Sequence, residues 1–163
     1  MIEPTSDVSF ASNSSLSNPP AELIARTQTR LLLVDDDDFF RESLGLNLID
    51  EGFAVTSFSN GNDTLKYFEA GGDADVLLLD WRMPGMDGLE VLRQMRSDST
   101  IKHVPVVMLT SSREEQDLVH SYELGVNAYV VKPVDFQKFV ESVKQIGMFW
   151  AIVNEPPPGV AKR

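Results

Sequence analysis

Four short apolar runs in this sequence end in residues that can take part in polar chemistry. The run VLLL ends at Asp80, a carboxylate whose burial is costly unless it is paired, hydrogen-bonded or metal-bound. The other runs, LLLV, VVML and YVV, end in Asp35 and Asp36, in Thr110 and in Lys132. Carboxylates, a hydroxyl and an ammonium therefore each follow directly after a short apolar run.

These side chains suit phosphoryl chemistry if the fold brings them together. Two carboxylates about 4 Å apart repel each other by about 1 kcal/mol in bulk water and about 4 kcal/mol near a protein surface, so the cluster would need a cation. Mg²⁺, or Mn²⁺ in its place, is the natural ion because it prefers carboxylate oxygens and also binds phosphoryl oxygens. With the ammonium of Lys132 nearby, Asp80 would act as the nucleophile and form an aspartyl phosphate.

The apolar runs alternate with segments of helical period, which predicts an α/β fold. Strands are expected at residues 31–34, 53–58, 75–80, 104–110 and 127–132, and helices at 38–52, 60–72, 88–97, 113–125 and 134–150. Such alternation favours right-handed crossovers and one five-stranded parallel sheet, doubly wound with helices on both faces. Because such sheets bind ligands outside the carboxyl ends of their strands, the polar residues should meet at one edge.

Length, composition and charge limit the number of domains and exclude some classes of function. The 163 residues suffice for one domain, expected over 29–153, with a Ser-, Asn- and Pro-rich disordered tail at 1–28 and a flexible tail at 154–163. The net charge of -11 argues against direct DNA binding, because phosphate neutralisation needs a basic face. The sequence has no apolar segment of the roughly 20 residues that span a bilayer, so we expect no membrane insertion. Because it also has no secretory signal and no cysteine, we expect a cytoplasmic protein.

Four motifs, LLLVDDDD, LLLDWRMPGMDG, MLTSS and AYVVKP, resemble the receiver domain of bacterial two-component response regulators, over about residues 30 to 150. The resemblance implies the flavodoxin-like (βα)5 receiver fold and phosphorylation of Asp80 by a partner histidine kinase. It also implies that Asp36 and Asp80 bind Mg²⁺ directly, that Asp35 binds it through water, and that the backbone carbonyl of Arg82 is a further ligand.

The same resemblance implies a clamp and a switch at the ends of the last two strands. Lys132 would clamp the phosphoryl group, and a cis bond between Lys132 and Pro133 would aim it, since a cis bond is cheap only before proline. Thr110 and Tyr129 would form the switch pair, in which the hydroxyl moves toward the phosphoryl group and the ring follows. A downstream protein target would then select the changed surface.

Each residue also has a simpler interpretation when it is taken singly. Asp37 or Asp38 suits a helix N-cap, and Thr110 could be a cap as well. Lys132 could be a surface ammonium, and Tyr129 a core aromatic. The occurrence of all the motifs together at strand ends favours the phosphoryl site.

Two other functions would use some of the same residues. A phosphatase of the haloacid dehalogenase type needs a second aspartate two residues after its nucleophile, and here that position is Arg82. We therefore expect the protein to catalyse only its own phosphorylation and dephosphorylation, with no turnover of an external substrate. A degenerate receiver that serves as a scaffold is disfavoured, because every expected acidic, hydroxyl and lysine residue is present.

The C-terminal part indicates partners. The few residues after Trp150 predict a stand-alone regulator, and the segment from VNAYVVKP to NEPPP resembles regulators that accompany bacterial phytochrome kinases. The partner kinase would then be a phytochrome. An apolar stripe that would usually be core continues past the expected edge of the sheet, which favours a homodimer. The stripe consists of Phe139, Val143, Ile146, Trp150 and Val153.

Overall fold

The computed structural model describes residues 28–111, 122–132 and 135–149. Several predictions lie outside these residues: both tails apart from Gln28, most of the helix expected at 113–125, the bond between Lys132 and Pro133, and the end of the apolar stripe at Trp150 and Val153. Within the described ranges, no helix has the length and apolar character needed to cross a membrane.

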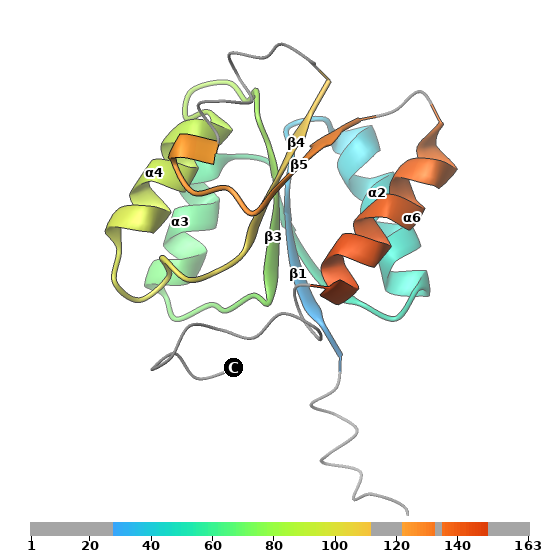
Figure 1. Cartoon of the computed structure of the whole chain (residues 1–163), viewed down its shortest axis with the longest axis horizontal. Helices are drawn as coiled ribbons and strands as arrows, with labels where there is room; N and C mark the ends of the chain where they lie inside the picture. Colours follow the sequence, from blue (N-terminus) through green and yellow to red (C-terminus); the bar gives the residue numbers. More distant parts are fainter. Residues whose placement is uncertain (1–27, 112–121, 133–134, 150–163) are drawn as a thin grey trace, which may run out of the picture.

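The five expected strands form one parallel sheet (Figure 1). They are β1 (Arg30–Val34), β2 (Ala54–Phe58), β3 (Val76–Asp80), β4 (Val106–Thr110) and β5 (Ala128–Val131). Their order across the sheet is β2-β1-β3-β4-β5, and every strand pair is parallel. The predicted doubly wound α/β fold is confirmed, and the point where the winding reverses lies between β1 and β3.

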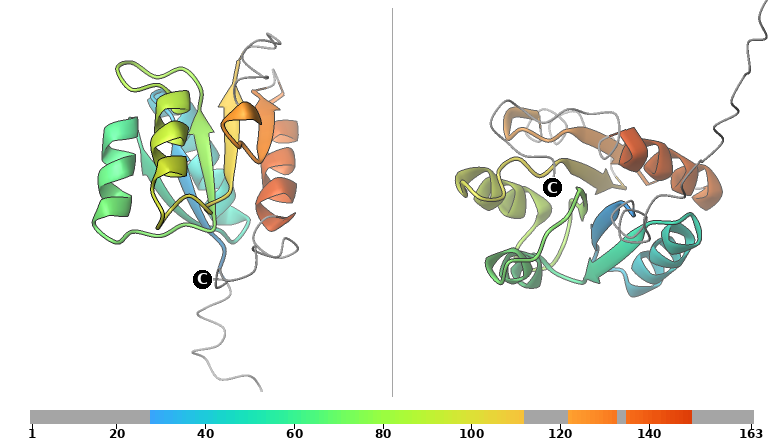
Figure 2. Two further views of the ribbon diagram at one scale, coloured as in Figure 1. Left: turned by 60° about the vertical axis from the view of Figure 1, so that its left-hand side comes forward. Right: turned by 90° about the horizontal axis from the view of Figure 1, so that it is seen from below.

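Helices cover both faces of the sheet (Figures 1 and 2). The helices α2 (Asp38–Asp50) and α6 (Phe136–Met148) lie on one face, and α3 (Gly61–Glu69) and α4 (Gly88–Ser97) lie on the other. At the start of each, a side chain accepts a hydrogen bond from the backbone N–H three residues later, and these caps are Asp37, Asn60, Asp87 and Asp135. The N-cap interpretation of Asp37 is therefore confirmed.

Some boundaries differ from the predicted ones for local reasons. The helix expected over 38–52 ends at Asp50, because Gly52 turns the chain with a φ of 95°, which favours glycine. The strand expected from 104 begins at Val106, because the N–H of Val104 bonds to the carbonyl of Ile101 in a turn. The last helix begins two residues late because Asp135 is its cap.

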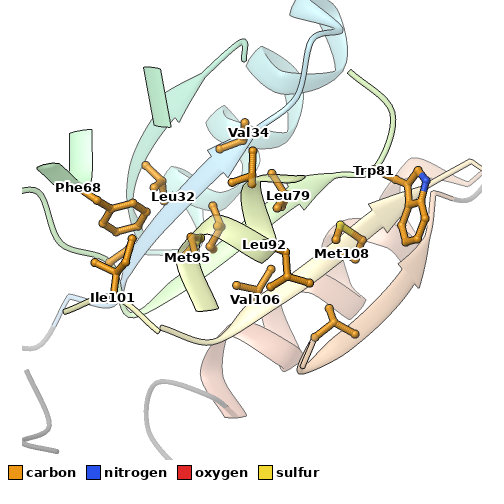
Figure 3. Close-up of a cluster of buried hydrophobic side chains, with 14 of the residues drawn as sticks. Leu32, Val34, Phe68, Leu79, Trp81, Leu92, Met95, Ile101, Val106 and Met108 are labelled. Atoms are coloured by element: carbon orange, nitrogen blue, oxygen red, sulfur yellow. The ribbon is translucent and has the colours of Figure 1, made fainter. Parts of the chain in front are cut away.

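Two apolar clusters hold the sheet between its helices. On the side of α3 and α4, side chains of β1, β3 and β4 pack with Leu92, Met95 and Phe68 (Figure 3). On the side of α2 and α6, the same strands pack with Leu44, Leu48 and Phe139. Every residue of β3 and β4 is buried, which explains why their sequences are apolar without alternation.

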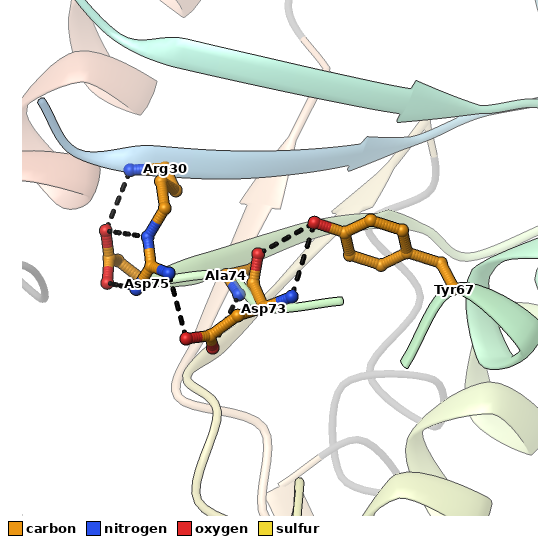
Figure 4. Close-up of polar contacts among 5 residues, drawn as sticks. All are labelled: Arg30, Tyr67, Asp73, Ala74 and Asp75. Carbon is orange, nitrogen blue, oxygen red and sulfur yellow. Dashed lines mark hydrogen bonds and ion pairs between the residues drawn. The ribbon is translucent and has the colours of Figure 1, made fainter. Parts of the chain in front are cut away.

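Ion pairs lie at the amino ends of β1 and β3, at the end of the sheet away from Asp35 and Asp80 (Figure 4). Arg30 donates from Nη1 to Asp73 at 2.8 Å and from Nη2 to Asp75 at 2.6 Å. The Tyr67 hydroxyl donates to the backbone carbonyl of Asp73 at 3.0 Å. These contacts tie the segment before β3 to both β1 and α3, and so help to fix the strands whose far ends carry the carboxylates.

Candidate functional site

Lys132 joins the carboxyl ends of β1 and β3. Its Nζ lies 2.6 Å from Oδ2 of Asp35 and 3.0 Å from Oδ1 of Asp80. One carboxylate oxygen from each of Asp35, Asp36 and Asp80 lies within 4.8 Å of the others. Four residues that the sequence predicted to form one site are therefore brought together.

The cluster is buried on one side and open on the other. Asp35 has no exposed surface and Asp80 is 6% exposed, whereas Asp36 is exposed to solvent. The side chain of Lys132 is only 18% exposed, so its interpretation as a surface ammonium is wrong. A ligand that approaches from the side of Asp36 would meet both other carboxylates.

Backbone contacts hold Asp35 in place. Its N–H donates to the carbonyl of Phe58 at 3.1 Å, and its Oδ1 accepts from the N–H of Asp37 at 2.9 Å. Arg41, from α2, donates through Nη1 to the backbone carbonyl of Asp35 at 2.7 Å. The helix that follows β1 thereby braces the loop that carries the acidic pair.

Burial and like charge disfavour ionised carboxylates in this cluster. Burial, followed by the charge of Asp35, raises the pKa of Asp80 to about 6 against the opposing effect of Lys132. Burial also raises the pKa of Asp35, although the bond to Lys132 acts in the other direction. Burial acts to lower the pKa of Lys132, but the hydrogen bond and charge of Asp35 and the charge of Asp80 raise it overall. One ammonium thus faces three carboxylates, and a further cation would relieve their repulsion.

The donor set fits a hard divalent cation. Three carboxylates offer oxygens at close range, and the exposed position of Asp36 leaves one side open to water, as a magnesium site requires. Arg82 is exposed and lies two residues beyond Asp80, and the role of its carbonyl as a ligand stays a prediction.

The loop after β3 fixes the backbone of Asp80. The N–H of Trp81 donates to the carbonyl of Leu109 at 2.8 Å, and the carbonyl of Trp81 accepts from the N–H of Gly88 at 2.9 Å. A Cβ atom at Gly88 would overlap the backbone carbonyl oxygen of Asp80. The first residue of α4 therefore packs so closely against the end of β3 that only glycine fits.

The two predicted switch residues lie on the neighbouring strands β4 and β5. Thr110 is 2% exposed, and its carbonyl accepts from the N–H of Lys132 at 2.6 Å. Tyr129 pairs with Met108 across the strands, and its ring meets that of Trp81 nearly edge-on, with centroids 6.3 Å apart. Partial burial against the cluster of Figure 3 agrees with a core role for Tyr129, and its role as a switch stays a prediction.

Sequence reasoning missed the aromatic neighbour of the lysine. In the helix expected at 38–52, Phe40, Leu44 and Leu48 follow one another at intervals of four residues, a spacing that indicates a helix and nothing more. In the structure the ring of Phe40 lies beneath Lys132, with Nζ 4.4 Å from the ring centroid. The spacing of Phe40 could not reveal this contact, because Lys132 follows it by more than ninety residues.

Comparison with known proteins agrees with this geometry. The family described as "Response regulator receiver domain" matches residues 31–144. Chemotaxis protein CheY of Pseudomonas aeruginosa is 36% identical over 117 residues, which cover 72% of this chain and 94% of that protein. Transcriptional regulatory protein CseB of Streptomyces coelicolor is 40% identical over 119 residues, but these span 73% of this chain and only 49% of that protein.

Three solved structures are similar in fold and sequence. The phosphorylated cyanobacterial phytochrome response regulator RcpA has a TM-score of 0.72 and 31% identity, covering 80% of this chain and 99% of that one. The Mn²⁺-bound response regulator Rcp1 has a TM-score of 0.69 and 27% identity, covering 79% and 99%. The bacteriophytochrome response regulator RtBRR has a TM-score of 0.62 and 46% identity, covering 81% and 86%.

Proposed function

Because the chain belongs to the response regulator receiver domain family, we propose that it accepts a phosphoryl group on Asp80 from a histidine kinase, in a reaction that requires Mg²⁺. The observation that carries the proposal is the bridge from Lys132 Nζ to Asp35 and Asp80, beside the exposed carboxylate of Asp36. This arrangement places a nucleophile, a cation and further oxygen ligands at the open edge of the sheet.

In the proposed transfer, Asp80 is the nucleophile and Lys132 is the protein's own cation. With a pKa of about 6, the carboxylate of Asp80 is mostly ionised at neutral pH and can attack phosphorus. A P–O bond to Asp80 forms as the P–N bond to the kinase histidine breaks, and the histidine leaves with its electron pair. Lys132 exchanges its contact with Asp80 for a phosphoryl oxygen and keeps its contact with Asp35, so the ammonium neutralises part of the transferred charge.

Asp36 and Asp80 would hold the metal directly, with Asp35 acting through water and Arg82 through its carbonyl. When bound, Mg²⁺ supplies charge neutralisation for the phosphoryl oxygens. The repulsion among the three carboxylates and their hard oxygen donors support this assignment, and the Mn²⁺-bound Rcp1 supports a divalent ion, with Mn²⁺ as a substitute.

The output would be a change in protein contacts. Phosphorylation adds charge and acceptor oxygens at Asp80, so the hydroxyl of Thr110, at the end of the adjacent strand, would move toward them. The Tyr129 ring would follow into the vacated space and alter the surface around β5. One charge-assisted hydrogen bond contributes only about 1.5 to 3 kcal/mol, so phosphorylation would shift the populations of two pre-existing states.

The partners follow from the same reasoning. Similarity to RcpA and RtBRR supports a phytochrome as the sensor kinase and a stand-alone regulator as the type of protein. The net charge of -11 supports a protein as the target over DNA, and we propose that the two proteins meet in the cytoplasm. Phe139 and Val143 prove to be core, while Met148 and Phe149 are 44% and 48% exposed, and this exposed end of α6 supports the proposed homodimer.

Transfer from a kinase tests the proposal. Candidate kinases, phytochromes among them, are autophosphorylated with radiolabelled ATP, freed of nucleotide and mixed with the full-length chain. We expect rapid transfer from one kinase in Mg²⁺, none in excess chelator and none to Asp80→Asn. Equal labelling of the Asp80→Asn variant would show that another residue accepts the group.

A further inference from the structure

Phe40 makes a contact at the site that the proposed reaction does not use. Nζ of Lys132 lies 4.4 Å from the centroid of its ring. The electron-rich face of an aromatic ring attracts an ammonium within about 6 Å of its centroid. The ammonium is therefore held by two carboxylates, those of Asp35 and Asp80, and by one ring face.

The ring of Phe40 is itself fixed by two other rings. Phe136 meets it edge-on at 6.0 Å and 87°, and Phe139 lies at 5.5 Å with the planes tilted by 56°. Both belong to α6, and Phe139 is only 1% exposed. Because α2 carries Phe40 and α6 carries the two supporting rings, the packing of these helices determines where the ring face lies.

We propose that Phe40 is a positioning residue for phosphoryl transfer: its ring face keeps the Lys132 ammonium at the site while the ammonium exchanges Asp80 for a phosphoryl oxygen. This inference rests on the proposed function. After transfer the contact with the free carboxylate of Asp80 is lost, and Asp35 alone would draw the ammonium toward the buried side. A ring face attracts the ammonium but takes up none of its N–H donors in a strong hydrogen bond, so these donors stay available to the phosphoryl oxygens.

The alternative is that Phe40 only fills space between α2 and α6. The two roles separate when the charge distribution of the ring is changed and its shape is kept. Fluorine withdraws electron density from the ring face and changes its size little, so a series of phenylalanines with one to five fluorines at position 40 keeps the packing and weakens the attraction.

The test uses the full-length chain and measures the rate at which acetyl phosphate labels it in Mg²⁺. We expect the rate to fall with each added fluorine, by about two- to fivefold in total, which corresponds to about 0.5 to 1 kcal/mol. Phe40→Leu should lose at least as much, and Phe40→Tyr should retain the rate. The same substitutions at Phe39, which is 82% exposed, serve as the control and should change nothing. A rate that does not depend on fluorine number would overturn the positioning role.

A second measurement separates this inference from the proposed function. The ring current of Phe40 should shift the Lys132 methylene protons next to Nζ upfield, and Phe40→Leu should abolish that shift while Phe39→Leu preserves it. Wild-type protein that is labelled but lacks the shift overturns the positioning role alone. Wild-type protein that shows the shift but is never labelled overturns the proposed function, and the positioning role with it.

Discussion

Replacing the proposed nucleophile should make the metal-free protein more stable. Asp80→Asn keeps the shape of the side chain and an oxygen that can accept from Lys132, but removes the charge that burial and Asp35 disfavour. Lys132 keeps Asp35 as its partner at 2.6 Å, so no buried charge is left unpaired by the change. In this account the site is arranged for a metal and a phosphoryl group, and the folded protein is less stable without them.

The size of the effect follows from the pKa of Asp80, which rises from 3.8 to about 6 on folding. Between these values the folded protein binds more protons than the unfolded chain, so the free energy of unfolding of wild type falls as pH rises. The ionised group costs about 1 kcal/mol at pH 4.5 and up to about 3 kcal/mol at pH 8. The stability advantage of Asp80→Asn should therefore grow by about 2 kcal/mol across this range.

Urea unfolding followed by circular dichroism, in excess chelator at both pH values, measures this difference. Glu42→Gln removes an exposed carboxylate from α2 and serves as the control, with an expected change of no more than about 0.5 kcal/mol at either pH. Added Mg²⁺ should narrow or reverse the difference, because it binds and stabilises wild type more than the variant. The reasoning is refuted if Asp80→Asn is no more stable than wild type at pH 8, or if its advantage does not depend on pH.

Three further substitutions test the scaffold and the switch. Arg96 donates to the backbone carbonyls of Lys102, Val104 and Gly125 and to the side chain of Asn127. Arg96→Lys should therefore lower the free energy of unfolding in urea by about 2 to 4 kcal/mol. The control Arg93→Lys affects only an exposed ion pair with Glu90 and should lower it by less than about 0.5 kcal/mol. Gly88→Ala should destabilise the protein by about 1 to 3 kcal/mol, because its Cβ would overlap the backbone of Asp80. The control Gly45→Ala, whose Cβ would meet only Val55 at 3.9 Å, should stabilise the protein by about 0.5 to 1 kcal/mol, because alanine favours a helix more than glycine does. Equal effects of the two substitutions in thermal unfolding would contradict the close approach at Gly88. Thr110→Ala should leave Asp80 open to phosphorylation but weaken the change in target affinity, and a full response in a binding titration would show that the switch runs through other residues.

The sequence predicted the fold because its local signals agree. The runs LLLV, VLLL and VVML are apolar without alternation, as strands covered on both faces must be, and Asp37 stands where a helix cap is needed. The limits of the elements were less predictable. Where a helix stops depends on a backbone conformation such as that of Gly52, which residue types favour but do not determine.

The site could be predicted in its strand-end residues and not in what surrounds them. Asp35, Asp80 and Lys132 were expected to meet because parallel strands place their carboxyl ends at one edge. The position of the Phe40 ring beneath Lys132 depends on how α2 packs against α6. The spacing of residues within each helix does not indicate which other helix it packs against. The same holds for the support that Arg41 gives to the backbone of Asp35, since an arginine on a helix is usually an exposed charge.

The central claim is that Asp80 accepts a phosphoryl group with the help of a divalent metal. Incubating the full-length chain with acetyl phosphate and Mg²⁺, followed by intact mass measurement and peptide mapping, tests it most directly. The account predicts one added phosphoryl group on Asp80, reduced labelling in Asp36→Ala, and none in excess chelator or in Asp80→Asn. Labelling that persists in chelator, or that maps to another residue, would contradict it.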